Sequence, residues 1–349
     1  MKFGSFNLIM FCFFVALLDA DQQTILVTGG AGYIGSHTVY LLAQQGHKLI
    51  VLDDFGYGQL DVVGTWATVI HGDYGDSQLL HDLFSRYSIA AVIHFAGFIA
   101  VGESVQNPLK YYDNNVSKTI NLLHCMREHN VDTIIFSSSA AVYGIPNKIP
   151  ILEEHITNPI NPYGHTKLMV EYILQDCSRA YGLKFVALRY FNACGAQPEV
   201  GLGEYHVPET HLIPLALRAA MYDTTFSIFG DDYATPDGTC IRDYLHVSDL
   251  ASAHVQALYY LKQGGSSTVF NLGTGIGYSV RQVLDVVNAI TGKKIKCAIQ
   301  KRRAGDPAVL IADAGKAEKV LGWKACRSDL RSIVESAYKF VSYGYQNRE

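Results

Sequence analysis

Three side chains in the middle of the chain have the types and the spacing of a proton-transfer system. Tyr163 and Lys167 lie four residues apart, so they share one face of the helix that Asn161-Pro162 is expected to begin. A free tyrosine has a pKa of about 10 and is a poor base at neutral pH. A neighbouring ammonium group favours the phenolate and makes Tyr163 usable as a general base. Ser139 ends a predicted strand, and its hydroxyl could hydrogen-bond the same substrate oxygen.

A glycine-rich turn supplies the binding site that such chemistry needs. Gly29, Gly32 and Gly35 lie between a predicted strand, 24–28, and a predicted helix, 33–45. The glycines permit a tight turn and close approach of a ligand to the backbone, and the helix N-terminus favours a pyrophosphate. Because strand, turn and helix occur in the right order, the motif predicts a dinucleotide site rather than a simple tight turn.

The acidic residues after the next two strands indicate which dinucleotide binds. Asp53 ends the second predicted strand, where a carboxylate accepts hydrogen bonds from the adenosine ribose. Asp54 comes next, and no Arg or Lys occurs from 55 to 69, so a 2′-phosphate would meet uncompensated negative charge. The sequence therefore predicts NAD rather than NADP, and the nicotinamide cation would further favour the phenolate of Tyr163. Asp73 is a candidate for adenine contact, or a plain turn residue.

Strands and helices alternate around these motifs. This rhythm predicts an α/β fold with a Rossmann-type doubly wound parallel sheet. We expect an NAD-binding domain over 23–192 and a smaller C-terminal substrate-binding domain over 193–349, whose late segments return to the first sheet. Residues 195–245 are rich in Gly, Pro, Asp and Thr, which predicts loops over a substrate. The other expected strands are 48–52, 69–70, 91–95, 133–136, 185–188, 269–272 and 295–299, and the other expected helices are 78–86, 109–128, 163–181, 280–290 and 330–341.

Composition excludes several classes of protein. The 349 residues are 49% hydrophobic and 17% charged, which supplies a buried core and argues against disorder. The formal net charge is -4 and no basic block occurs, so no nucleic-acid partner is expected. The seven Cys form no Cys-x-x-Cys pair, and the 13 His show no H-E-x-x-H spacing. Neither a disulfide framework nor a zinc site is expected, and the metal prediction is none.

The first 22 residues stand apart from this pattern. Lys2 precedes an apolar run that is short for a membrane span, which needs about 20 residues, so no stable span is expected. The run resembles a signal peptide with Ala20 as a cleavage residue. The alternatives are a membrane anchor and an extension that arises from a wrongly chosen start site.

Several stretches together resemble the UDP-galactose (UDP-glucose) 4-epimerases of the extended short-chain dehydrogenase/reductase superfamily. The resemblance runs from about residue 24 to 343 and rests on 28–37, 94–97, 101–104, 111–115, 136–144, 162–167, 189–192 and 238–246. It implies an NAD-dependent isomerase that acts on a UDP-hexose. It also implies a homodimer in the cytoplasm, where UDP-sugars and NAD occur, with export by the N-terminal segment as the alternative.

The resemblance also implies a role for each candidate residue. Tyr163 takes the proton of the sugar 4-hydroxyl, Ser139 shares that hydrogen bond, and Lys167 holds the nicotinamide ribose. Leu310 occupies a position where a bulky residue excludes 2-acetamido sugars, although it could simply pack in the core. Ile99 stands where some members have a Lys. The other implied cofactor contacts are Tyr33, Ile34, Phe95 and Asn114, and the other implied substrate contacts are Asn192, Leu212, Phe229, Arg242, Arg303 and Asp306.

Two other functions compete with epimerisation. A nucleotide-sugar 4,6-dehydratase or decarboxylase of the same fold needs an acid–base carboxylate pair after the serine. Here Ala140 and Ala141 come directly after Ser139, and an alanine cannot transfer a proton. A non-catalytic NAD-binding sensor would tolerate the loss of Tyr163 or Lys167, yet both are present. Catalytic turnover distinguishes this second alternative from an enzyme.

Overall fold

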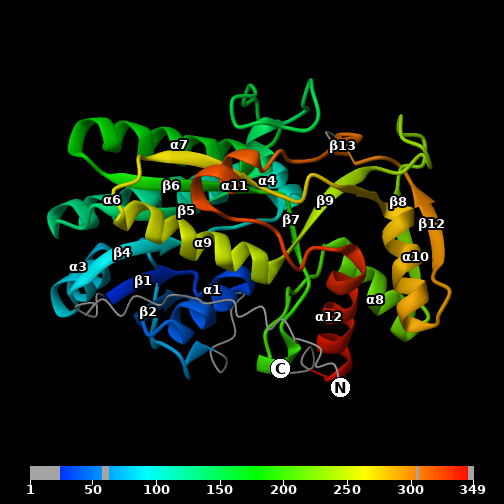
Figure 1. The fold of residues 1–349 in the computed structure, drawn as a ribbon, viewed down its shortest axis with the longest axis horizontal. Helices are drawn as coiled ribbons and strands as arrows, with labels where there is room; N and C mark the ends of the chain where they lie inside the picture. Colours follow the sequence, from blue (N-terminus) through cyan, green and yellow to red (C-terminus); the bar gives the residue numbers. More distant parts are fainter. Residues whose placement is uncertain (1–23, 57–62, 304–305, 345–349) are drawn as a thin grey trace, which may run out of the picture.

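A seven-stranded parallel sheet organises the protein (Figure 1). The structure is a computed structural model and describes residues 24–56, 63–303 and 306–344. The strand order is β10-β6-β5-β4-β1-β2-β3, which reverses direction between β1 and β4, so the predicted doubly wound class is confirmed. The strands are β1 (Thr24–Thr28), β2 (Lys48–Asp53), β3 (Thr68–His71), β4 (Ile89–His94), β5 (Thr133–Ser139), β6 (Lys184–Tyr190) and β10 (Thr268–Leu272).

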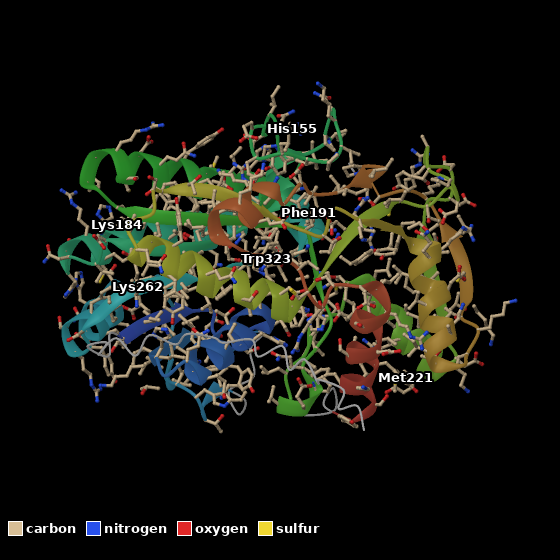
Figure 2. The ribbon with its side chains drawn as sticks, in the orientation of Figure 1. His155, Lys184, Phe191, Met221, Lys262 and Trp323 are labelled. Atoms are coloured by element: carbon tan, nitrogen blue, oxygen red, sulfur yellow. The ribbon has the colours of Figure 1, made fainter. Side chains whose placement is uncertain are left out.

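Helices cover both faces of this sheet, because alternate strand residues point to opposite sides. Ile25 and Val27 of β1 pack into one apolar cluster, and Leu26 packs into the other. Figure 2 places Trp323 in the interior, where its indole N–H donates to the Asp249 carbonyl over 2.9 Å. One face carries α1 (Tyr33–Gln44), α9 (Val247–Lys262) and α11 (Gly315–Leu321), and the other carries α3 (Ser77–Arg86), α6 (Lys118–Glu128) and α7 (Pro162–Tyr181).

The later part of the chain builds a second core at one end of the molecule (Figure 1). The prediction of loops over 195–245 is wrong in part, since this stretch contains a helix and several strands. The helix α8 buries Ile213, Leu217 and Ala220 at helical spacing. The elements here are β7 (Asn192–Cys194), α8 (Leu212–Tyr222), β8 (Thr225–Phe229), β9 (Ile241–His246), β11 (Gly277–Ser279), α10 (Val280–Thr291), β12 (Lys296–Gln300), β13 (Val309–Leu310) and α12 (Leu330–Ser342).

The continuous helix predicted over 109–128 is interrupted. After α4 (Val101–Gln106) and α5 (Pro108–Tyr112), a π-helical turn, Asp113–Ser117, precedes α6. Within it the Asn115 amide accepts from the Phe98 N–H over 2.8 Å and donates to the Phe98 carbonyl over 3.0 Å. These two hydrogen bonds connect the π-helical turn to the segment after β4. The hydrophobic periodicity of the sequence does not reveal such a turn.

A buried ion pair ties α7 to the sheet. The Arg189 guanidinium donates to both carboxylate oxygens of Glu171, with Nε 3.0 Å from Oε1 and Nη2 2.6 Å from Oε2. Ser138 donates to the same carboxylate, and Arg189 also donates to the Tyr143 hydroxyl over 2.9 Å. Glu171 is one helical turn beyond Lys167, so the ion pair holds the face of α7 that carries the predicted catalytic pair.

His94 closes β4 in an equally buried position. Its Nδ1 lies 2.6 Å from Thr28 Oγ1, and its Nε2 lies 3.0 Å from Thr119 Oγ1. Burial, with a smaller contribution from the charge of Lys167, lowers the pKa of His94 to about 3. The ring is therefore neutral at physiological pH and joins β1, β4 and α6 through hydrogen bonds.

Removing the charge of Glu171 should destabilise the fold. The substitution Glu171→Gln leaves the Arg189 guanidinium buried without its carboxylate, and losing one partner of a buried pair costs about 3–5 kcal/mol. Urea unfolding measures the loss. As a control, Glu335→Gln removes a carboxylate whose Oε1 lies 2.8 Å from Arg331 Nε on the exposed side of α12, and should cost roughly 0–1 kcal/mol. Equal losses in the two variants would contradict this role.

Acid should destabilise the wild-type protein more than a His94→Gln variant. The folded pKa of His94 lies below the unfolded value of about 6.5, so the unfolded chain binds the extra proton and stability falls as pH falls through this window. Between about pH 7.5 and 5.5 the difference in unfolding free energy between the two proteins should shrink by about 1.4 kcal/mol. Urea titrations at both pH values measure this difference. A constant difference would show that His94 does not contribute.

Candidate functional site

The structure brings the three predicted proton-transfer residues together. Tyr163 and Lys167 lie in the first turns of α7, which Asn161 caps by accepting from the Gly164 N–H over 2.8 Å. Lys167 Nζ lies 5.9 Å from the centre of the Tyr163 ring, and the Ser139 hydroxyl interacts with the Tyr163 hydroxyl. The C-terminal end of β5 and the N-terminal end of α7 therefore form one polar centre.

Burial controls the pKa values in this centre. Burial raises the pKa of Tyr163, while the hydrogen bond with Ser139 acts in the opposite direction. Burial also lowers the pKa of Lys167 to about 8, while the Glu171 carboxylate acts in the opposite direction. In the protein alone, burial thus acts against the phenolate of Tyr163. That the Lys167 ammonium and a bound nicotinamide cation together make Tyr163 a better base remains a prediction.

The glycine turn fits a dinucleotide pyrophosphate. Gly29 has a φ of 69°, and a Cβ there would lie 2.5 Å from Ala96 N, while a Cβ on Gly35 would lie 2.3 Å from the Gly29 carbonyl oxygen. These two glycines are required by the packing of the turn itself. At Gly32 a Cβ would meet only the Gly29 oxygen, at 3.3 Å, so this Cα faces open space where α1 begins. A ligand backbone can approach there and accept from the N–H groups of Tyr33 and Ile34.

Asp53 holds the glycine turn as well as ending β2. Its carboxylate accepts from the Ala31 N–H over 2.9 Å and from the Phe55 N–H over 2.8 Å, and burial raises its pKa. Asp54 is exposed, and its Oδ1 accepts from the Gly56 N–H over 2.9 Å. Two carboxylates thus stand at the end of β2, which suits a ribose with free hydroxyls and disfavours a 2′-phosphate.

The remaining predicted cofactor residues have protein partners of their own. Phe95 comes directly after β4, and its ring centre lies 4.5 Å from that of His254. Asn114 is buried in the π-helical turn, and its amide donates to Asn115 over 3.1 Å. Asp73 forms an ion pair with Lys118, at 2.5 Å between Oδ2 and Nζ. An adenine contact by Asp73 remains a prediction.

Two arginines predicted to grip a diphosphate lie on separate elements. Arg242 of β9 forms an ion pair with Asp306, and its Nη2 also donates to the Pro307 carbonyl over 2.7 Å. The Arg303 guanidinium lies 4.3 Å from the centre of the Phe229 ring, at the end of β8. Four of the predicted substrate residues thus contact one another in two pairs, Arg242 with Asp306 and Arg303 with Phe229.

Three further predicted substrate residues lie on separate elements: Asn192 on β7, Leu310 on β13 and Leu212 on α8. Asn192 donates to the Asp243 carbonyl over 3.0 Å. Leu310 pairs with Arg242 between β13 and β9 and packs, half-buried, on the apolar cluster that contains Ala140. Leu212 begins α8 and packs on the second core, so its side chain serves that core.

Sequence reasoning missed several residues that support the centre. The Ser137 carbonyl accepts from Lys167 Nζ over 2.8 Å, and Asn115 donates to Thr166 over 3.2 Å. Glu171 could have been found, since it continues the spacing of Tyr163 and Lys167 along one helix face. A backbone carbonyl and an amide bridge carry no such sequence signal.

Comparison with known proteins agrees with this geometry. Residues 25–273 match the family model "NAD dependent epimerase/dehydratase family". A UDP-glucose 4-epimerase of Halalkalibacterium halodurans is 51% identical over 319 residues, which cover 91% of this chain and 95% of that protein. Among solved structures, the UDP-glucose 4-epimerase of Brucella ovis in complex with NAD has a TM-score of 0.88 at 48% identity, covering 93% of this chain and 98% of that one.

A second solved structure contains both a nucleotide cofactor and a uridine nucleotide. The UDP-glucose 4-epimerase of Bifidobacterium longum, in complex with NAD+ and UDP, has a TM-score of 0.86 at 42% identity, covering 93% of this chain and 99% of that one. The family match spans most of the chain and includes the glycine turn, Ser139, Tyr163 and Lys167. The resemblance inferred from the sequence is therefore confirmed, and this chain belongs to the NAD-dependent epimerase/dehydratase family.

Proposed function

We propose that this protein interconverts UDP-galactose and UDP-glucose by inverting the configuration at C4 of the sugar. The observation that carries the proposal is the polar centre of Ser139, Tyr163 and Lys167, at the same edge of the sheet as the glycine turn after β1. The relatives from Halalkalibacterium halodurans and Brucella ovis bear the name of this activity. A uridine nucleotide accompanies NAD+ in the Bifidobacterium longum structure.

Each residue of the centre has a distinct task in the proposed reaction. When bound, NAD supplies a hydride acceptor that is restored within the same turnover. Tyr163 takes the proton of the 4-hydroxyl as C4 loses its hydride, and Ser139 orients the same oxygen. Lys167 is anchored by the Ser137 carbonyl and holds the nicotinamide ribose. Once the 4-keto sugar had rotated to present its other face, Tyr163 would return the proton to the C4 oxygen as C4 regained a hydride from the bound cofactor.

The turning sugar needs a fixed anchor, which we assign to the diphosphate. Arg242 and Arg303 present planar guanidinium groups, which suit bidentate contact with phosphate oxygens. Asn192 would contact the phosphates or sugar, Phe229 would pack near the uracil, and Asp306 would meet the uridine ribose. Holding the nucleotide while leaving the hexose free lets both faces of C4 reach the same hydride carrier.

A dehydratase or decarboxylase is disfavoured by the two alanines that come after Ser139. Ala140 begins a 3-10 turn, Ala140–Tyr143, and is itself buried. Neither Ala140 nor Ala141 can deprotonate C5 or assist elimination at C6. Incubation of the protein with UDP-galactose, without added cofactor, tests the proposal directly. Chromatography should detect UDP-glucose, whereas a dehydrated sugar or unchanged substrate would contradict it.

We propose that the protein is a homodimer and that the surface formed by α4, α5 and α7 contacts the second copy. The helices α4 and α5 pack against α7, and all three expose apolar side chains. Val105 is 62% exposed, Leu109 77% and Tyr172 51%. Exposed apolar residues gathered on adjacent helices are typical of a protein interface.

We also propose a cytoplasmic location and a division of the chain near residue 192. None of the helices in the described part of the chain is long and apolar enough to cross a membrane. Residues 1–22, on which the signal-peptide alternative depends, lie outside the described residues.

The cofactor residues lie before about 192 and most substrate residues after it, which supports an NAD-binding part and a mainly substrate-binding part.

Replacing the proposed base should abolish most of the activity. Tyr163→Phe keeps the ring but removes the hydroxyl, and loss of a general base lowers the rate by roughly 100- to 10,000-fold. The variant should still release NAD on denaturation, and Ser139→Ala should lose less activity. Tyr181→Phe, at an exposed position at the end of the same helix, is the matched control and should keep its activity. Near-normal turnover by Tyr163→Phe would refute the assignment.

Leu310 should control whether 2-acetamido sugars are accepted. Leu310→Tyr adds bulk beside Arg242 and should lower kcat/KM for UDP-N-acetylgalactosamine relative to UDP-galactose, by about 10- to 200-fold at most. Leu310→Ser should raise the same ratio. Ile299→Tyr, on an exposed position of β12, is a control for the added ring. An unchanged ratio in both Leu310 variants would place the specificity elsewhere.

A further inference from the structure

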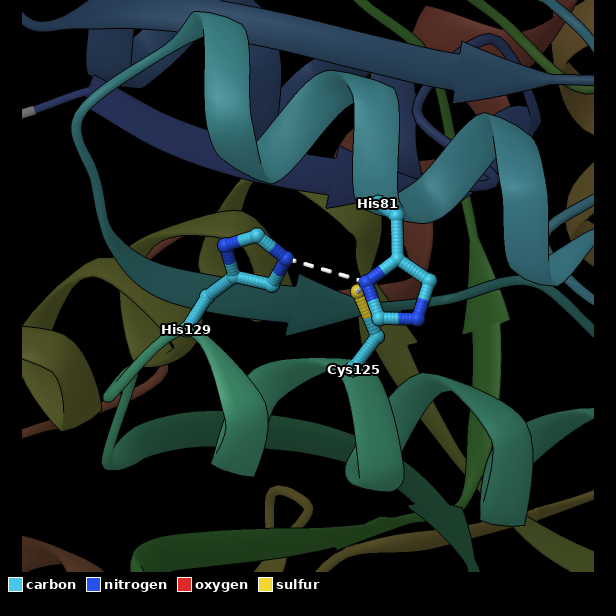
Figure 3. A group of neighbouring side chains, drawn as sticks. All are labelled: His81, Cys125 and His129. Atoms are coloured by element: carbon cyan, nitrogen blue, oxygen red, sulfur yellow. Dashed lines mark hydrogen bonds between the residues drawn. The ribbon is translucent and has the colours of Figure 1, made fainter.

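Three metal-ligating side chains meet between α3 and α6 (Figure 3). His81 comes from α3, while Cys125 belongs to α6 and His129 stands directly after that helix. Cys125 and His129 are four residues apart and therefore lie on one face of the helical turn. Figure 3 shows that all three side chains point into the space between the two helices. Cys125 is buried and the two histidines are partly buried.

Two of the three distances between the ligand atoms are close to those around one tetrahedral metal ion. His81 Nδ1 lies 3.0 Å from His129 Nε2 and 3.8 Å from Cys125 Sγ. Zinc bonds of about 2.0–2.1 Å to nitrogen and 2.3 Å to sulfur, at tetrahedral angles, separate two nitrogens by about 3.3 Å and a nitrogen from a sulfur by about 3.6 Å. The third pair, Cys125 Sγ and His129, lies within 4.8 Å, so one ion can be reached by all three side chains.

A carboxylate stands behind one of these ligands. Glu128 Oε2 lies 3.4 Å from His81 Nε2, the ring nitrogen that faces away from the cluster. A carboxylate on the far nitrogen of a metal-bound histidine fixes the tautomer and strengthens the ligand. A hydrogen bond between two neutral histidines alone would not require this arrangement. The His81 side chain is 38% exposed, which leaves a route for an ion from solvent.

The cluster is remote from the proton-transfer centre. Asn115 lies at the start of the helical run, near the centre, and His129 lies at its end. The 14 residue steps from Asn115 to His129 span about 20 Å along the helix. The cluster thus lies at the N-terminal end of β5, whereas the proton-transfer centre lies at its C-terminal end. A role in proton or hydride transfer does not fit this position.

We propose that His81, Cys125 and His129 bind one Zn²⁺ ion that fastens α3 to α6, with water as the fourth ligand. Imidazole nitrogen and thiolate sulfur are both common ligands of tetrahedral Zn²⁺. Binding requires the thiolate, so the Cys125 proton passes to solvent as the Zn–S bond forms. The site is independent of the proposed epimerase activity.

Cobalt spectroscopy tests this proposal on untagged, metal-free protein. Titration with Co²⁺ should produce a sulfur-to-cobalt charge-transfer band in the near ultraviolet that saturates at one ion per chain. Added Zn²⁺ should remove the band and raise the melting temperature. The band reports thiolate ligation, so it cannot arise from the second cluster of potential ligands, Glu204, His206, Glu209 and His211, which lacks sulfur.

Variants assign the band to named ligands. Cys125→Ser should abolish it, His81→Gln and His129→Gln should each weaken Co²⁺ affinity by at least about 10-fold, and Glu128→Gln should weaken it by a similar factor. Cys326→Ser, at an exposed cysteine, should leave the band unchanged. Absence of the band in the wild type at excess Co²⁺, or its survival in Cys125→Ser, would overturn the proposal. The partly exposed histidine variants keep the test decisive if Cys125→Ser fails to fold.

Discussion

The burial of Lys167 is the constraint on which the proposed active centre depends. An ammonium group leaves water only at a large cost, which here lowers its pKa to about 8. The Ser137 carbonyl offsets part of this cost by accepting from Nζ over 2.8 Å, and the charge of Glu171 favours the protonated form. Glu171 is in turn held by Arg189. Lys167, the proposed catalytic lysine, is therefore supported by a chain of buried charges that joins α7 to β6.

The same burial would make the pair depend on a ligand of positive charge. Tyr163 and Lys167 both have pKa values displaced toward their neutral forms, so the protein alone does not stabilise the phenolate. An oxidised nicotinamide would add a fixed positive charge in a site of low polarity, where charge interactions are strong. Tyr163 would then become a base only when the hydride acceptor is in place. Proton and hydride removal would be coupled by electrostatics.

The sequence predicted the fold and the proton-transfer centre because their signals are local. The spacing of Tyr163 and Lys167, the glycine turn and the alternation of elements are each readable over a few residues. The features that it did not predict depend on contacts between distant segments. The Asn115 bridge to Phe98 accompanies the π-helical turn, and α8 lies among Gly- and Pro-rich flanks that resemble loops. The cluster of His81 and Cys125 joins residues 44 positions apart, so no spacing motif could indicate it.

The arginines show how the proposed substrate site is prepared before it acts. The Arg242 guanidinium donates to Asp306 and the Pro307 carbonyl through Nη2 and to the Ile241 carbonyl through Nη1, which fixes its plane. Arg303 is held against the Phe229 ring, an arrangement that leaves the edges of its guanidinium group available for hydrogen bonds. An arginine already held in one orientation loses less conformational freedom when it binds an anion. In the proposed reaction the sugar rotates between two hydride transfers, so the diphosphate must be held by rigid anchors.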